Sequence, residues 1–128
     1  MLEVVRRDDR LAAQIENGTG DGVYRLLFRA LVSDPDEVRS FYEDTVAAVV
    51  AYDRQYRSEL LSTLEAYLAQ DCNMNATARA IFAHRHTVAY RLDRIKELTG
   101  LDPGSSADRE RIGLGIKAYR ILAPTLPK

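Results

Sequence analysis

The fold of this chain is decided by residues 75–99, which read NATARAIFAHRHTVAYRLDRIKELT. This stretch predicts a short helix over residues 76–83 with Asn75 as its cap, because asparagine is a favoured helix N-cap. After a connection of two or three residues, a longer helix is expected over residues 85–99. Gly100 follows, and a glycine just past the last turn is a common helix end. Apolar residues recur along the longer helix at the spacing of one buried face. They are Val88, Leu92, Ile95 and Leu98.

Two helices with so short a connection have the layout of a helix-turn-helix, whose second helix enters the major groove of DNA. The charge of this stretch fits that layout. Between Arg79 and Lys96 the sequence carries five basic side chains and one acidic side chain, Asp93. With the apolar face turned inward, basic side chains remain for the outer face. The pattern therefore predicts DNA binding through several phosphate contacts and one or two base contacts.

Candidate contact residues follow from position and hydrogen-bonding type. Arg85 lies where the second helix would first meet base edges, and a guanidinium can donate two hydrogen bonds to guanine O6 and N7. We expect Arg85 to read a base directly. At the start of the shorter helix, free N–H groups and the helix dipole favour a phosphate. The further candidates are His84, His86 and Thr87 for a base edge or a phosphate, Tyr90, Arg91 and Arg94 for the DNA backbone, and Asn75 and Thr77 for a phosphate.

Helical periodicity continues along the rest of the chain, and no alternating strand pattern of five or more residues occurs. The sequence predicts an all-α fold, a helical bundle of five to seven helices around one core. An opening helix up to Glu16 and a loop at 17–22 with three glycines are expected first. The remaining helices are expected over residues 23–32, 34–53, 58–70 and 107–122.

Charge is unevenly distributed along the chain. Residues 1–78 carry 8 basic and 14 acidic side chains, and residues 79–128 carry 10 basic and 5 acidic side chains, which makes the two parts −6 and +5. A solvated helix face explains many such charge runs, but the sign change also fits a second part that meets a polyanion.

Other classes of function lack their motifs. A lone cysteine, Cys72, forms neither an internal disulfide nor a cysteine-rich metal site. His84 and His86 would point about 200° apart on a helix, which is unsuited to one metal ion. The sequence has no phosphate-binding glycine loop, nucleophile elbow or paired carboxylate motif. We therefore expect no enzyme activity, no cofactor and no metal. Without a secretion signal or a long apolar run, a cytoplasmic protein without a membrane partner is expected.

Five segments of the chain share a pattern with one known family. They are Leu60 to Leu68, Asn73, Ala76 to Ala80, His84 to Ile95, and Leu98 to Gly100. Together they resemble the C-terminal helix-turn-helix domain of the PucR/CdaR family of bacterial transcription regulators, and the resemblance covers residues 58–122. The helix pair is more loosely similar to that of the factor for inversion stimulation.

The resemblance implies sequence-specific DNA binding by a transcription activator, with the double-stranded DNA as partner. It also implies that residues 1–30 are the tail of an upstream regulatory domain or a linker, that residues 31–128 form the DNA-binding domain, and that the effector-sensing domain is absent from this chain. Two positions depart from the family. His86 is more often asparagine, and Ala89 can be arginine, so this member holds its site with one cation fewer.

An alternative is a helical module for protein–protein interaction or dimerisation without DNA contact, formed by the apolar stripes of residues 34–53 and 58–70. The two interpretations are compatible, because helix-turn-helix proteins commonly bind DNA as twofold dimers. We therefore also expect a homodimer.

Overall fold

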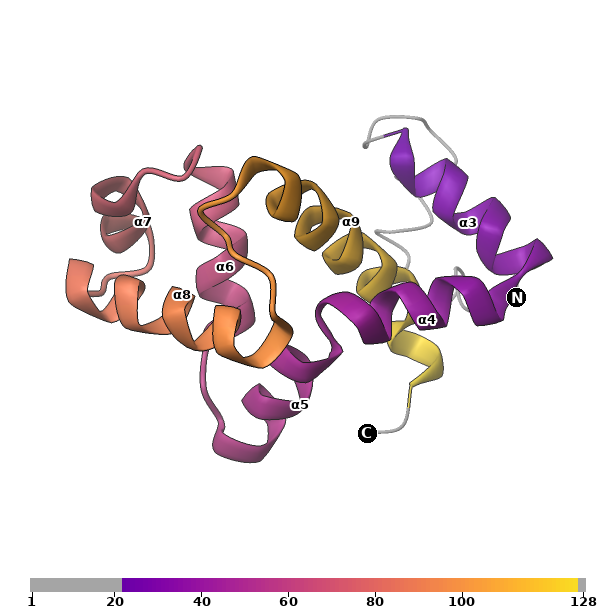
Figure 1. Ribbon diagram of the computed structural model, residues 1–128, viewed down its shortest axis with the longest axis horizontal. Coiled ribbons are helices and arrows are strands. Elements are labelled where there is room, and N and C mark those ends of the chain that lie inside the picture. The colour runs from indigo at the N-terminus through magenta and orange to yellow at the C-terminus, as the bar shows by residue number, and fades with distance from the viewer. Residues whose placement is uncertain (1–21, 127–128) are drawn as a thin grey trace. The chain divides into compact units, whose positions relative to one another are not determined.

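The computed structural model describes residues 22–126, which form seven α-helices and one 3-10 helix and contain no strand (Figure 1). The all-α fold predicted from periodicity is confirmed for these residues. The expected opening helix and nearly all of the loop at 17–22 lie outside the described residues. The sequence predicted one core, whereas the described chain divides into two compact units, residues 22–44 with 114–126 and residues 45–113. Within residues 22–126, no helix is long and apolar enough to cross a bilayer.

The first unit is built from helices at both ends of the described chain. Its elements are α3 (Val23–Ser33), most of α4 (Pro35–Thr45), the last part of α9 (Ser106–Leu122) and the 3-10 helix Ala123–Thr125. The rings of Tyr42 and Tyr119 stack with their centroids 5.5 Å apart. The buried apolar side chains of this unit are Leu31, Val38, Tyr42, Ile116, Ala118, Ile121 and Leu122.

The second unit contains the predicted helix-turn-helix. Its elements are α5 (Ala47–Tyr56), α6 (Leu60–Ala69), α7 (Met74–Ala80), α8 (Arg85–Thr99) and the first part of α9. α8 packs against α5, α6 and α7, as the ribbon shows (Figure 1). The buried apolar side chains are Val46, Val49, Val50, Leu60, Leu64, Tyr67, Ala78, Val88, Ile95, Leu101 and Ile112.

The single helix predicted over residues 34–53 is wrong. α4 ends at Thr45 and α5 begins at Ala47, with Val46 between them at φ −111° and ψ −1°. Thr45 and Val46 are adjacent β-branched residues, which are slightly unfavourable in helices, and they are 1% and 0% exposed. The helix is therefore interrupted where these two stiff side chains are buried. Tertiary packing sets this break, although the periodicity of the sequence continues through it.

The start of α6 is fixed by a side chain from α5. The carboxylate of Asp53 accepts hydrogen bonds from the backbone N–H of Leu60 at 2.9 Å and of Leu61 at 3.0 Å. The hydroxyl of Ser58 donates to the same carboxylate. These bonds satisfy N–H groups that have no partner within a helix, and a negative charge at this end is also favoured by the helix dipole. Asp53 therefore caps α6 from a distance and ties it to α5.

Of the two helices of the motif, the longer one has the predicted bounds, and the shorter one begins earlier than predicted and has a different cap. α8 runs from Arg85 to Thr99, as predicted, and Gly100 ends it at φ 73°. α7 begins at Met74, and its N-cap is Asn73, whose Oδ1 accepts a hydrogen bond from the N–H of Ala76 at 2.9 Å. The predicted cap, Asn75, is instead the second residue of the helix. The other predicted helices, 23–32, 58–70 and 107–122, are observed at Val23–Ser33, Leu60–Ala69 and Ser106–Leu122.

Candidate nucleic-acid interface

The turn between α7 and α8 has the geometry of a Schellman helix end. The N–H of Ala83 donates to the carbonyl of Ala78 at 2.9 Å, and the N–H of Phe82 donates to the carbonyl of Arg79 at 3.3 Å. These are the two bonds that close such an end, and the residue between helix and turn then adopts a left-handed conformation. That residue is Phe82, at φ 54°. A connection this tight fixes the direction in which α8 leaves the turn.

Phe82 occupies a position where glycine is usual. A side chain costs about 1–2 kcal/mol in the left-handed region, and Phe82 is 97% exposed. The backbone has nevertheless adopted the left-handed turn, because the two closing hydrogen bonds and the packing of α7 on α8 require it.

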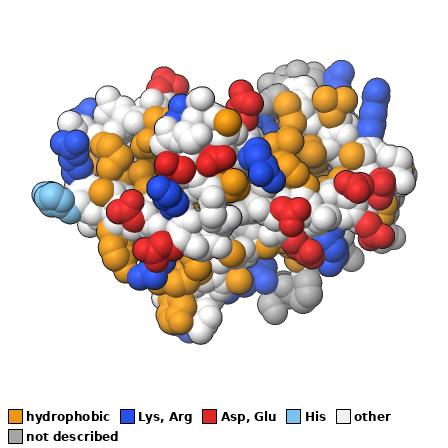
Figure 2. All heavy atoms as spheres, in the orientation of Figure 1, with side chains coloured by type: hydrophobic (Ala, Val, Ile, Leu, Met, Phe, Trp, Pro, Cys, Tyr) orange, Lys and Arg blue, Asp and Glu red, His pale blue; other side chains and the backbone are white. Residues whose placement is uncertain are grey.

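Two imidazoles protrude where α8 begins. His84 is the N-cap, and its Nδ1 accepts a hydrogen bond from the backbone N–H of His86 at 3.1 Å. The two rings stack with centroids 4.8 Å apart. Figure 2 shows these side chains, the two histidines of the chain, projecting from the surface. Because Nδ1 of His84 is an acceptor, the proton of its neutral ring lies on Nε2, which leaves an N–H donor directed away from the helix.

Two arginines of the motif are exposed to solvent. Arg85 is the first residue of α8, and Arg79 lies in the last turn of α7. Both side chains are exposed, and neither forms a hydrogen bond or ion pair with another residue in the range 22–126. Further along α8, Val88 and Ile95 are 0% exposed. Leu92 is half-buried and Thr87 is half-buried at the edge of the outer face.

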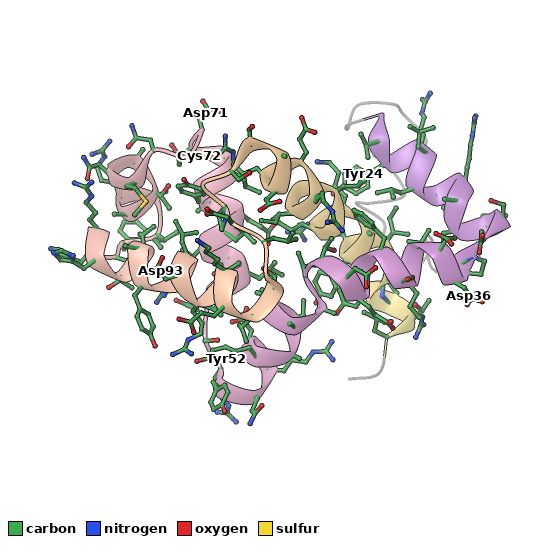
Figure 3. All side chains as sticks on the ribbon, in the orientation of Figure 1. Tyr24, Asp36, Tyr52, Asp71, Cys72 and Asp93 are labelled. Atoms are coloured by element: carbon green, nitrogen blue, oxygen red, sulfur yellow. The ribbon has the colours of Figure 1, made fainter. Side chains whose placement is uncertain are left out.

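Arg94 lies within an aromatic cluster further along α8. Its Nη2 donates to the hydroxyl of Tyr90 at 3.0 Å and its Nη1 donates to Glu97 Oε2 at 3.2 Å. The guanidinium carbon lies 5.7 Å from the ring centre of Tyr90 and 5.8 Å from that of Tyr52, a cation–π arrangement. Figure 3 shows Tyr52 next to α8. The hydrogen bond with Tyr90 is the largest cause that raises the pKa of Arg94 above its ordinary value. Tyr90 itself is 59% exposed.

Arg91 is directed toward α6. Its Nη1 donates to Thr63 Oγ1 at 2.9 Å, and its Nη2 lies 3.6 Å from Glu59 Oε2. The Arg91 side chain is 23% exposed. Arg91 is one of the two arginines expected to contact the DNA backbone, and its guanidinium is instead bound to another helix of the protein.

The two candidates on α7 differ in exposure. Asn75 is exposed. Thr77 is 0% exposed, and its hydroxyl donates to the carbonyl of Asn73 at 2.7 Å. This hydroxyl is therefore used inside the protein, which removes the Thr77 side chain from the outer surface on which a phosphate could bind.

Some features of this surface were not assigned from the sequence. The sequence presents Arg79 only as one of five cations, although this residue lies in the last turn of α7, just before the connection to α8. Arg91 is predicted on the outer face, although it lies three residues after Val88 and four before Ile95, spacings that place side chains on one helix face. That spacing was the signal for its inward direction. Within the described part of the chain, no cluster of three or more possible metal ligands occurs.

The PucR C-terminal helix-turn-helix domain matches residues 60–118. The transcriptional activator PmfR of Paenarthrobacter nicotinovorans is 50% identical over 60 residues, which are 47% of this chain and 13% of that protein. The purine catabolism regulatory protein of Bacillus subtilis is 31% identical over 88 residues, 69% of this chain and 16% of that protein.

A third relative, the carbohydrate diacid regulator of Escherichia coli, is 50% identical over 50 residues, 39% of this chain and 13% of that protein. The matched region thus spans less than a fifth of the length of each of these three relatives. No solved structure is significantly similar to the chain.

Proposed function

Since residues 60–118 belong to the PucR C-terminal helix-turn-helix domain family, we propose that this part of the chain binds double-stranded DNA sequence-specifically with α8 in the major groove. The observation that carries the proposal is the start of α8. There the exposed side chains of His84, Arg85 and His86 gather at one end of a helix whose inner face is buried at Val88 and Ile95. A rigid, cationic helix start is what insertion into the groove requires.

Roles at this surface follow from exposure and free donors. Arg85 has both edges of its guanidinium available for a guanine, whose O6 and N7 accept two parallel hydrogen bonds. His84 offers Nε2–H, and therefore binds an acceptor, either a base atom or a phosphate oxygen. The remaining proposed contacts are His86 and Thr87 to a base or phosphate, and Arg79, Asn75, Tyr90 and Arg94 to the DNA backbone.

For the protein as a whole, the proposal is a transcription activator that acts in the cytoplasm, where its DNA is, and that has no catalytic activity. PmfR is named an activator, which supports the direction of regulation. Residues 31–128 supply the DNA-binding part, and residues 1–30 belong to an upstream regulatory region or linker. Effector sensing lies in a domain outside this chain. This part of the proposal is supported by the relatives, which are much longer than the region they share with this chain. Binding as a homodimer would place two copies of α8 about one DNA turn apart.

The test is selection of bound duplexes from a random DNA pool by the 128-residue chain, followed by fluorescence anisotropy on the selected duplex. We expect a consensus with twofold symmetry and an affinity that falls steeply with salt, with a slope of about −0.9 for each neutralised phosphate. The matched control is Lys117 changed to alanine, a cation of α9 outside the motif. Absence of binding at low salt would reject the proposal and favour a helical interaction module.

A further inference from the structure

Arg91 lies on the inner side of the helix that is proposed to read DNA. An α-helix turns about 100° per residue, so a side chain three positions after Val88 lies only about 60° from it around the helix axis. Val88 and Ile95 are both fully buried. The Arg91 side chain starts at the margin of this buried face and remains largely covered, with 23% of its surface exposed.

The guanidinium is held by two groups of α6. Nη1 donates to Thr63 Oγ1 at 2.9 Å, and Nη2 lies 3.6 Å from Glu59 Oε2. Thr63 is 0% exposed, and its hydroxyl proton is already donated to the carbonyl of Glu59 at 2.7 Å. The Thr63 oxygen therefore faces Arg91 as an acceptor and has no proton to offer elsewhere. A phosphate that took the Arg91 guanidinium would leave this buried oxygen without its donor, which is unfavourable.

The end of α6 that receives Arg91 is itself fixed. Asp53 of α5 accepts hydrogen bonds from the backbone N–H groups of Leu60 and Leu61, which lie between Glu59, the N-cap of α6, and Thr63 in its first turn. Arg91 thus connects α8 to a capped helix start whose position depends on α5. A planar guanidinium that donates to the buried Thr63 oxygen and lies within ion-pair distance of Glu59 limits how α8 can rotate about its own axis and slide along α6.

We propose that Arg91 is a positioning residue, which sets the rotation of α8 on α6 so that the start of α8 meets base edges in register, and that it does not bind a phosphate. The proposal rests on the proposed DNA-binding function. It has a specific consequence, since rotation of α8 displaces Arg85 relative to base edges but leaves its charge near the DNA. Loss of Arg91 should therefore reduce affinity for the specific sequence far more than affinity for unrelated DNA.

The experiment measures the affinity of the 128-residue chain for the selected duplex and for an unrelated duplex over a range of salt concentrations. The variants are Arg91→Ala, Arg91→Lys and Thr63→Val, and valine keeps the volume of threonine while it removes the acceptor oxygen. Arg79→Ala, which removes an exposed arginine of the same motif, is the matched control for a phosphate contact. Thermal unfolding by circular dichroism checks that each variant is folded.

If Arg91 positions α8, Arg91→Ala and Thr63→Val both lower affinity for the selected duplex about tenfold or more, change affinity for the unrelated duplex little, and leave the salt slope unchanged. Arg91→Lys does not restore the specific affinity, because an ammonium cannot make the two anchored contacts of a guanidinium. Arg79→Ala instead weakens binding to both duplexes and reduces the slope by about 0.9. A mere loss of stability would lower the melting temperature without changing the ratio of the two affinities.

The inference is overturned if Arg91→Ala reduces the salt slope by about 0.9 on both duplexes and Arg91→Lys restores it, or if Thr63→Val binds like the wild type. Thr63→Val decides the question should Arg91→Ala fail to fold. Failure of the proposed function gives a different result, since the wild-type chain would then bind neither duplex.

Discussion

Nδ1 of His84 accepts a hydrogen bond from the backbone N–H of His86 at 3.1 Å, and the two imidazole rings stack 4.8 Å apart. One side chain thus both caps α8 and stands at the surface proposed to contact DNA. Capping and recognition can be separated, because asparagine caps a helix as histidine does here but carries no imidazole.

For His84, replacement by alanine should lower the free energy of unfolding by about 0.5–1 kcal/mol, in the range found for lost N-caps. Replacement by asparagine should restore the stability but not the full DNA affinity. Urea denaturation and anisotropy on the selected duplex measure the two effects. Equal stability of the alanine and wild-type chains would show that the Nδ1 bond contributes nothing to α8.

Replacing Arg85 with alanine should remove discrimination at one base pair. A bidentate contact to guanine contributes about 1–3 kcal/mol of discrimination, which corresponds to roughly 5- to 150-fold in affinity. The measurement compares the selected duplex with duplexes that carry each other base pair at every position. Arg79→Ala is the control, because a backbone contact weakens all duplexes alike. A variant that still prefers the same base at every position would contradict base readout by Arg85.

Phe82 should be replaceable by glycine with a gain in stability. Glycine relieves a left-handed penalty of about 1–2 kcal/mol but loses about 0.4–1 kcal/mol through the freer unfolded chain, so the net gain should be about 0.5–1 kcal/mol. Since alanine keeps the Cβ atom and its penalty, Phe82→Ala is the matched control and should show no gain. Denaturant midpoints of the two variants decide the matter, and a lower midpoint for glycine than for alanine would contradict the prediction.

Asp53→Ala should destabilise the second unit. The substitution leaves the N–H groups of Leu60 and Leu61 and the Ser58 hydroxyl without the acceptor that they share. We expect a loss of about 1–2 kcal/mol, as for the stronger helix caps, and a smaller loss for Asp53→Asn, which keeps one acceptor oxygen. Ser58→Ala, which leaves both backbone bonds intact, should cost less than either. A ranking in which Ser58→Ala is the most damaging would refute the cap assigned to Asp53.

The motif itself could be predicted from residues close together in the chain. The bounds of α8 follow from the apolar spacing of Val88 and Ile95 and from Gly100, which ends the helix in the left-handed conformation. The cap of α7 was misplaced by two residues, because Asn73 and Asn75 are equally good caps and sequence alone gave no reason to prefer Asn73. The choice depends on the preceding turn, where Cys72 at φ 64° directs the chain into α7.

The candidate surface was predicted in part, and the rest depended on partners remote in sequence. Exposure of Arg85 and His86 follows from their place at a helix start. The spacing of Arg91 from Val88 and Ile95 indicates its inward direction, but its partner Thr63 lies 28 residues away. The burial of Thr77 depends on the packing of α7 against α6 and α8. The break at Val46 likewise arises from the burial of two stiff side chains rather than from any helix-breaking residue.

The amino-acid sequence by itself determined that this protein is helical, where its two motif helices lie, and that the stretch between Arg79 and Lys96 is cationic, because propensity, periodicity and charge act over one or two helical turns. Only the tertiary structure decided which arginines remain free for a partner and which are bound to the protein. A long side chain can reach several neighbours, and the neighbour it contacts is set by how the helices pack.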